Sequence, residues 1–276
     1  MKNHVTFAAF DISSADVIPF DPVDYSKFKF GSKIVARKFA RKLAIDYWEI
    51  VLSHFPSDQK IVVYPSPYNF IPTATSALTD YFIRYLNDHL IDAGRPVVET
   101  GKVNRNTTYR EDYGAMSAEQ RMNMIGNDKF YIDCGQIDDK LLVFMDDIKI
   151  TGSHERMIER MLTAQNVPND CHFLYFAQLT NNSIDPTIEN YLNFAYVNSL
   201  LDINRIIRDD DFAYNTRTIK YILNSDHVQC SSFLDYQSFR FLDTMYHLAI
   251  GNNYHQIPEY EQNLLYLKSL IKKWSH

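Results

Sequence analysis

Short, continuous apolar runs alternate with helical segments through the first two thirds of the chain, and this alternation limits the fold more than any other feature. An apolar run without polar alternation is typical of a strand that is buried on both faces. Three such runs are clear and two are weaker: residues 60–64, 141–145 and 173–178, then 97–99 and 129–132. Helical spacing is strongest over residues 32–55 and returns in 75–89 and after Gly152. The sequence therefore predicts an α/β fold, a parallel sheet with helices on both faces.

The pattern changes after about residue 180. Residues 200–207, 218–223, 232–248 and 258–274 have helical spacing and many Tyr and Phe side chains, and only 194–197 resembles a strand there. We therefore expect an α/β domain over residues 1–180, in which the first 24 or so form an extension. A mainly helical C-terminal subdomain over 181–276 should pack on it.

Composition excludes several classes of protein. The net charge of −6 argues against general affinity for nucleic acid or for anionic membranes. The apolar runs are too short to span a bilayer, and the first residues lack the long apolar stretch of a signal peptide. Three widely spaced cysteines are typical of reduced thiols, so we expect a soluble cytoplasmic protein. The nine histidines show no metal-ligand spacing, so the sequence does not predict a structural metal site.

Two adjacent carboxylates, Asp146 and Asp147, end the clearest apolar run in the stretch LLVFMDDIKITGSH over residues 141–154. A turn with Thr151, Gly152 and Ser153 follows and opens a helix. The free N–H groups of a helix N-terminus suit a phosphate, and carboxylates upstream suit sugar hydroxyls. The alternative is that the pair only caps the helix or forms an acidic pocket. The stretch thus indicates either a ribose-phosphate site or a structural turn.

The stretch resembles the PRPP-binding loop of type I phosphoribosyltransferases, in which four apolar residues and two acidic ones precede a Thr-Gly turn. Residues 25–44 (YSKFKFGSKIVARKFARKLA) resemble the lysine-aromatic-glycine opening of the ComF-like branch, and residues 63–68 (VYPSPY) resemble its proline-x-proline strand end. Residues 104–123 resemble its flexible loop. Together these stretches cover about residues 25–179 in the order of the family.

The resemblance implies a phosphoribosyltransferase that moves a 5-phosphoribosyl group from PRPP to an unidentified nitrogen acceptor and releases pyrophosphate. Asp146 and Asp147 would bind the ribose hydroxyls, with Mg²⁺ held indirectly through ribose and water. Arg105 and Arg121 would close over the pyrophosphate. Two loops would complete the site, the 5′-phosphate loop of Ile148, Lys149, Ile150, Thr151, Gly152, Ser153 and His154, and the pyrophosphate loop of Ser66, Pro67, Tyr68 and Asn69. The bound ligand would be PRPP or a nucleoside 5′-monophosphate.

The chain departs from the family pattern at three points. His154 stands where the family has threonine, and Ile150 replaces a residue that often carries a hydroxyl. Residues 69–77 (NFIPTATSA) contain no glycine and no basic residue, where an Arg-Gly stretch is expected. These departures leave an alternative, a catalytically inactive sensor or scaffold that binds ribose phosphate. The aromatic helices could also bind a protein partner or a second copy of the chain.

Overall fold

The computed structural model describes residues 3–55, 58–105 and 130–274. Its centre is a five-stranded sheet in the order β1-β7-β6-β2-β3, in which every pair of neighbouring strands is parallel. The strands are β1 (His4–Ile12), β2 (Ile61–Tyr64), β3 (Glu99–Thr100), β6 (Leu141–Lys149) and β7 (Cys171–Leu179). The predicted α/β class with a parallel sheet is confirmed, and the three clear apolar runs are its three central strands.

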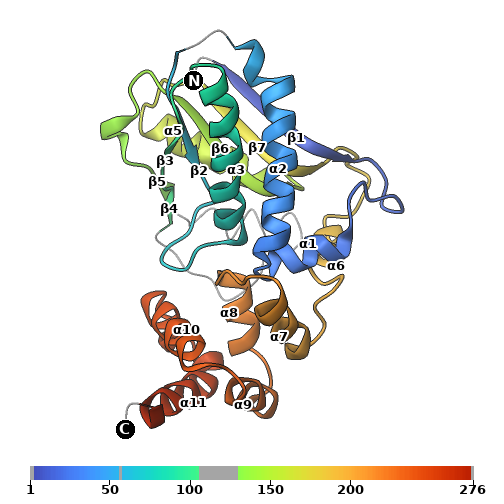
Figure 1. The fold of residues 1–276 in the computed structure, drawn as a ribbon, viewed down its shortest axis with the longest axis vertical. Helices are drawn as coiled ribbons and strands as arrows, with labels where there is room; N and C mark the ends of the chain where they lie inside the picture. The colour runs from blue at the N-terminus through green and yellow to red at the C-terminus, as the bar shows by residue number, and fades with distance from the viewer. Residues whose placement is uncertain (1–2, 56–57, 106–129, 275–276) are drawn as a thin grey trace.

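Helices cover both faces of the sheet (Figure 1), as predicted. Helices α2 (Lys33–Ile50) and α3 (Ala74–Asp92) lie on one face, and α5 (Ser153–Ala164) lies on the other. In β2, Val63 packs into the core on the α2 and α3 face, while Val62 packs with residues of α5. Because alternate side chains enter two different cores, the strand has no polar face, which explains its continuous apolar sequence.

The first residues of the chain contribute a strand that the sequence did not predict. The predicted extension over residues 1–24 contains β1, which pairs in parallel with β7 from His4↔Cys171 to Ile12↔Leu179. Helix α1 (Pro22–Lys29) follows, and the side chain of Asp21 caps its N-terminus by accepting a hydrogen bond from the Val23 N–H. The weak strand expected at residues 129–132 is β5 (Phe130–Tyr131). It lies outside the main sheet because it pairs antiparallel with β4 (Asn104–Arg105).

Six helices form the C-terminal part: α6 (Ile188–Asn193), α7 (Leu200–Asp209), α8 (Thr216–Leu223), α9 (His227–Asp235), α10 (Phe239–Gly251) and α11 (Pro258–Trp274). The single helix predicted over 232–248 is wrong. The chain breaks between α9 and α10 because Ser238 caps α10 by accepting a hydrogen bond from the Phe241 N–H. The strand suggested at 194–197 is not formed. Ile188 and Leu192 of α6 pack into the sheet's core, so the packing changes later than the boundary expected at residue 180.

Gly31 lies at a close contact between the helical part and the sheet part. Its φ of +102° is a conformation that other residues rarely adopt. A Cβ at this position would lie 2.4 Å from the carbonyl oxygen of Ala213, so only glycine lets the two chain segments meet here. The carbonyl of Gly31 in turn accepts a hydrogen bond of 2.8 Å from the Ala213 N–H.

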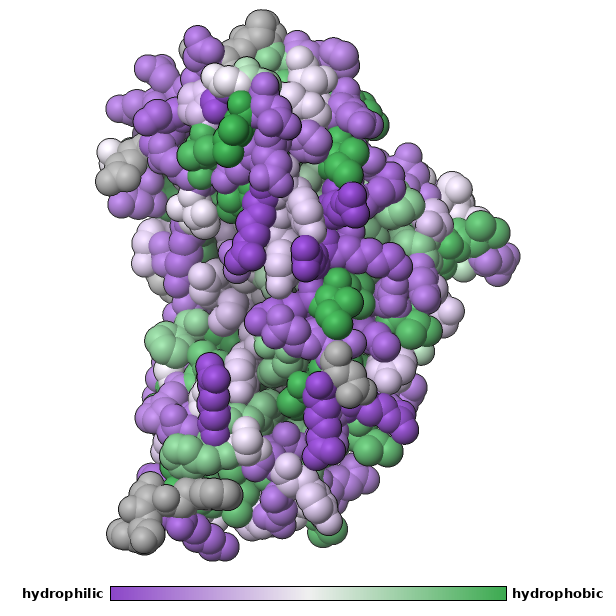
Figure 2. Space-filling view, viewed as in Figure 1, coloured by the Kyte–Doolittle hydropathy of each residue, from purple (hydrophilic) through white to green (hydrophobic). Residues whose placement is uncertain are grey.

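Polar residues cover most of the face shown in Figure 2, with apolar residues scattered among them. Among the helices of the described ranges, none combines the length and the hydropathy that a transmembrane span requires.

Candidate functional site

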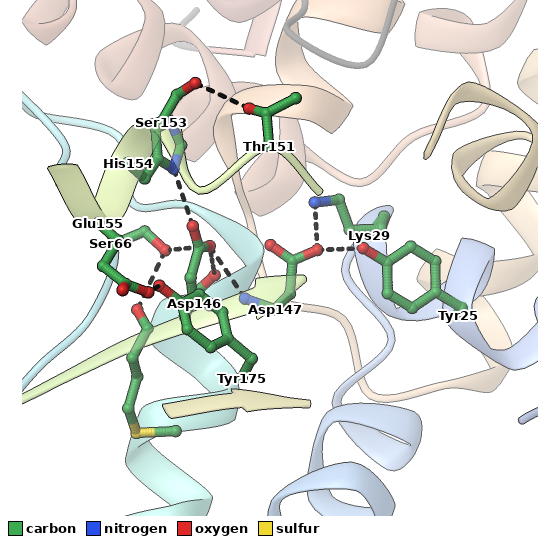
Figure 3. Close-up of polar contacts among 12 residues, drawn as sticks. Tyr25, Lys29, Ser66, Asp146, Asp147, Thr151, Ser153, His154, Glu155 and Tyr175 are labelled. Carbon is green, nitrogen blue, oxygen red and sulfur yellow. Dashed lines mark hydrogen bonds and ion pairs between the residues drawn. The ribbon is translucent and has the colours of Figure 1, made fainter. Parts of the chain in front are cut away.

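The acidic pair lies in the second half of β6, near the edge of the sheet where parallel strands end. The sequence suggested that Asp146 and Asp147 stand at the end of the strand. The ladder with β7 continues to Lys149↔Gln178, so both residues lie within the paired strand. Successive side chains of a strand leave it in opposite directions. Figure 3 shows the result, with the Asp146 carboxylate turned toward Ser66 and His154 and the Asp147 carboxylate turned toward α1.

Asp146 is the meeting point of the two predicted ligand loops. Its Oδ1 accepts hydrogen bonds from the Ser66 hydroxyl at 2.7 Å and from the Asp147 N–H at 2.9 Å, and its Oδ2 lies 2.8 Å from Nδ1 of His154. Burial alone would raise the pKa of Asp146, but these partners outweigh it and hold the pKa well below its usual value. The same contact raises the pKa of His154. A carboxylate thus stands ionised between two loops.

Asp147 faces helix α1 and is almost fully buried, with 5% of the residue exposed. Its Oδ2 accepts a short hydrogen bond from the Tyr25 hydroxyl and lies 2.5 Å from Nζ of Lys29. Burial and the charge of Asp146 raise the pKa of Asp147, against the effect of the Lys29 ammonium. The neighbouring lysine therefore compensates the second carboxylate inside the protein.

The turn after β6 contains a left-handed glycine at the start of a helix. Gly152 is left-handed, with φ +68°, and it is the N-cap residue of α5. The hydroxyls of Thr151 and Ser153 lie 2.7 Å apart. Arg156 closes the turn from the side, because its guanidinium donates to the Thr151 carbonyl at 2.9 Å and to the Ser153 hydroxyl at 3.2 Å. Hydroxyls, a helix N-terminus and a guanidinium thus converge on one turn.

Three residues of the predicted loop turn their side chains elsewhere. Ile148 is buried in the core beside α2 and α3, and Ile150 packs against that core, so both offer a ligand only their backbone. Lys149 forms an ion pair of 2.7 Å with Glu155 and lies over the ring of Tyr175. The side chains of the loop that lie at the turn itself therefore begin at Thr151.

The predicted pyrophosphate loop lies beside Asp146, at the end of β2. Ser66 reaches Asp146 as described, and Pro67 is buried. A lysine from another segment lies beside this loop. Nζ of Lys102 is 4.4 Å from the centre of the Tyr68 ring and donates to the Asn69 carbonyl at 2.9 Å. A cation–π contact and a carbonyl hold this ammonium at the loop.

Of the two predicted pyrophosphate arginines, Arg105 lies among the described residues and Arg121 does not. Arg105 lies in β4, and its positive charge acts to lower the pKa of His154, so it is near the site. A bridge between Tyr68 and Asn104 ties the same segment to the pyrophosphate loop. Arg121 and most of the predicted loop over residues 104–123 fall outside the described residues.

The acidic pair does not suit a directly bound Mg²⁺. Mg²⁺ takes six oxygen ligands, and three of the four oxygens of this pair already accept hydrogen bonds from protein groups. The donor set does suit sugar hydroxyls, which donate a proton and carry no charge. Mg²⁺ fits this site only if the ligand itself holds the ion.

Sequence reasoning missed four side chains of the site, namely Tyr25, Lys29, Lys102 and Arg156. For Arg156 a signal existed, because a residue three positions into a helix lies next to the turn that precedes it. For Lys29 the signal was weaker, since it belongs to the lysine-aromatic-glycine stretch but is 118 residues from Asp147. Spacing alone gave no reason to pair Lys102 with Asn69.

One family of known proteins matches the chain over most of its length. The chain matches the family model described as "PRTase ComF-like" over residues 4–267, from β1 into α11. No curated protein sequence matches the chain. Two crystal structures of a hypoxanthine phosphoribosyltransferase from Staphylococcus aureus are similar at 10% sequence identity. The tetragonal form covers 52% of this chain and 74% of its own with a TM-score of 0.33, and the orthorhombic form covers 60% and 79% with a TM-score of 0.30.

Proposed function

Since the chain belongs to the ComF-like phosphoribosyltransferase family, we propose that it binds PRPP and transfers the 5-phosphoribosyl group to a nitrogen acceptor, with release of pyrophosphate. The observation that carries this proposal is the contact of 2.8 Å between Asp146 and His154. It joins an ionised carboxylate, suited to sugar hydroxyls, to the first turn of a helix suited to a phosphate. The proposed ligand would span that contact.

In the proposed complex, the 5′-phosphate would lie against the turn at Gly152. The backbone N–H groups at the start of α5 and the hydroxyls of Thr151 and Ser153 would donate to it, and Arg156 would contribute its charge. The Asp146 carboxylate would then accept a hydrogen bond from a ribose hydroxyl in exchange for one of its present partners. Asp147, held by Lys29 and Tyr25, would contribute its remaining oxygen.

The leaving pyrophosphate would meet Lys102 and Arg105 at the neighbouring loop. Charge grows on pyrophosphate as the bond to C1 breaks, and fixed cations near it lower the barrier. Mg²⁺ carried by PRPP would neutralise part of the same charge. Lys102 thus takes the place of the basic residue that the segment 69–77 lacks. The acceptor nitrogen remains to be identified by experiment.

A single assay tests the proposal. The protein is incubated with PRPP, Mg²⁺ and a panel of nucleobases, and released pyrophosphate is measured. We expect release with at least one base, and its loss in Asp146→Asn. The variant Asp88→Asn, which changes an exposed carboxylate of α3, serves as the matched control and should keep full activity. Equal activity in both variants, or release that no base stimulates, would count against transfer.

One observation favours the alternative of a ribose-phosphate sensor without turnover. Lys29 already compensates Asp147, which leaves Asp146 as the one carboxylate of the pair not bound to a lysine. A sensor would bind ribose 5-phosphate and lose affinity in Asp146→Asn, yet release no pyrophosphate with any base. Calorimetry beside the pyrophosphate assay separates the two. Under either function we propose a cytoplasmic setting, where PRPP and nucleotides occur, and no role for nucleic acid as a ligand.

A further inference from the structure

A second cluster of ligand-type side chains lies between the edge strand β1 and helix α5. It consists of His4, Glu155 and Glu159, whose candidate ligand atoms all lie within 4.8 Å of one another. Nε2 of His4 is 3.3 Å from Oε1 of Glu155, and its Nδ1 is 2.8 Å from Oε1 of Glu159. The two glutamates are four positions apart in one helix, so they share a face and point to the same strand.

Neighbouring groups fix the orientation of Glu155. Its Oε2 accepts a hydrogen bond of 2.8 Å from the Tyr175 hydroxyl and pairs with Lys149 at 2.7 Å, which leaves Oε1 directed at His4. Supporting hydrogen bonds of this kind orient metal ligands in proteins.

The imidazole is also held in place, and a further oxygen lies near it. The His4 ring packs on Phe173, with 4.7 Å between the ring centres. The Thr6 hydroxyl lies 3.4 Å from Nε2 of His4 and 3.3 Å from Oε1 of Glu155. One candidate ligand atom from each of His4, Glu155 and Glu159 therefore lies within 4.8 Å of the other two at the sheet edge, and the Thr6 hydroxyl lies beside them.

We propose that His4, Glu155 and Glu159 bind a first-row transition-metal ion of the Zn²⁺ class, with water as the fourth ligand. Imidazole together with carboxylate selects such ions, whereas Mg²⁺ and Ca²⁺ prefer oxygen ligands alone. Tetrahedral Zn²⁺ with bonds of about 2.0–2.2 Å needs its ligand atoms about 3.4 Å apart. The candidate ligand atoms, one from each residue, already lie within 4.8 Å of one another, so a small rotation of the His4 and Glu159 side chains would bring them to that spacing. The His4 and Glu159 side chains are 29% and 30% exposed, so they can adjust and an ion can enter.

This site adjoins the proposed ribose-phosphate site, since Lys149 of the phosphate loop pairs with Glu155, but it shares no residue with that site and does not depend on the function assigned there. Its cation would fasten β1, the first strand of the chain and an edge of the sheet, to a helix that follows β6. The competing interpretation is an ion-pair network, in which a protonated His4 bridges the two glutamates without any metal. The two interpretations differ in what happens when Zn²⁺ is added.

The test is calorimetric titration of the full chain with ZnCl₂, after chelator treatment and without a polyhistidine tag. The variants are His4→Gln and Glu159→Gln. The control is His247→Gln, because His247 also faces a carboxylate four positions away, Asp243 at 3.3 Å, but belongs to no such cluster among the described residues. We expect one saturable site in the wild-type protein, weakened at least about tenfold in both variants and unchanged in the control.

Three further readouts make the test decisive. Co²⁺ should give the visible absorption of a four-coordinate complex in the wild-type protein and not in Glu159→Gln. Mg²⁺ and Ca²⁺ should bind at least about tenfold more weakly than Zn²⁺, given the preference of imidazole for transition metals. Circular dichroism confirms that the variants fold. The same Zn²⁺ affinity in all four proteins, no saturable binding, or equal affinity for Mg²⁺ would overturn the proposal.

Discussion

The ammonium nitrogen of Lys29 lies 2.5 Å from the carboxylate of Asp147, inside the protein and between α1 and β6. Only 10% of the lysine side chain and 7% of the aspartate side chain are exposed. The pair therefore joins the lysine-aromatic-glycine stretch to the acidic stretch, the two segments of the sequence that most resemble the family. It also occupies Oδ2 of Asp147, so that oxygen is not available to a ligand while the pair is intact.

Removal of Lys29 should destabilise the fold strongly. Lys29→Met leaves Asp147 buried beside Asp146 without its cation, and loss of one partner of a buried pair costs about 3–5 kcal/mol. Denaturation in urea measures the change. Lys42→Met is the matched control, since Lys42 also lies 2.5 Å from a carboxylate, that of Asp46, but is 48% exposed. That change should cost less than about 1 kcal/mol. Similar losses in the two variants would show that burial does not decide the energy.

Gly31→Ala should be much more harmful than Gly94→Ala. Both glycines have positive φ, so alanine strains the backbone at each. A Cβ at Gly94 meets no atom within 4 Å, whereas at Gly31 it meets the Ala213 carbonyl at 2.4 Å. We expect about 1 kcal/mol for Gly94→Ala and a clearly larger loss for Gly31→Ala, measured as free energies of unfolding. Equal losses would mean that the junction moves apart without cost.

Gly152→Ala tests the phosphate turn. Its φ is +68°, and a Cβ would meet only the ends of the Arg156 and Lys149 side chains, at 3.2 and 3.4 Å, which can move. The stability cost should therefore be about 1 kcal/mol. A phosphate seated on the turn has no such freedom, so ribose 5-phosphate should raise the melting temperature of the wild-type protein and not that of the variant. The same shift in both proteins would place phosphate binding elsewhere.

The free energy of unfolding should decrease as the pH is lowered, because of His172. This residue is fully buried, and burial lowers its pKa to about 4 from 6.5. The unfolded chain therefore binds the proton first. Neutral His172 therefore contributes stability that is fully present above pH 6.5 and is lost as the pH falls toward 4. The loss amounts to on the order of 3 kcal/mol.

The variant His172→Gln isolates this effect. Glutamine keeps a hydrogen-bonding partner for the Tyr47 hydroxyl, which lies 2.6 Å from Nδ1 of His172, but it cannot take up a proton. Urea denaturation between pH 7 and pH 4 should give a shallower loss of stability in the variant than in the wild-type protein. An unchanged slope would assign the acid sensitivity to other groups.

The sequence was sufficient for the parts of the fold that local rules determine. Residues 60–64 and 141–145 were found because strands buried on both faces must be apolar throughout, and α11 because its apolar residues follow a helical period between Pro258 and Trp274. The break between α9 and α10 was missed, since the apolar spacing continues across it. Spacing cannot detect a cap that interrupts a helix without interrupting the pattern.

For the candidate site as well, the sequence could indicate the residues of a local motif but not the contacts between distant segments. Asp146 and Gly152 belong to one local motif, so a single strand-to-helix turn places them both. The contacts of Asp147 with Lys29, and of Asn69 with Lys102, depend on how distant elements pack. Nothing in one sequence fixes those distances. Lys102, to which we assign the role of the basic residue missing from residues 69–77, lies on another segment and reaches the loop only in the fold.

The pairing of β1 with β7 has a consequence for synthesis of the chain. Asn3 and Asp170, which hydrogen-bond beside the start of that ladder, are 167 residues apart. At roughly 5–20 residues per second, β1 leaves the ribosome about 10–30 s before its partner exists. Throughout that interval an apolar stretch, HVTFAAFDI, has no strand to pair with. Nascent chains arrested before Cys171 should therefore be good substrates for chaperones, and release of the remaining residues should end that dependence.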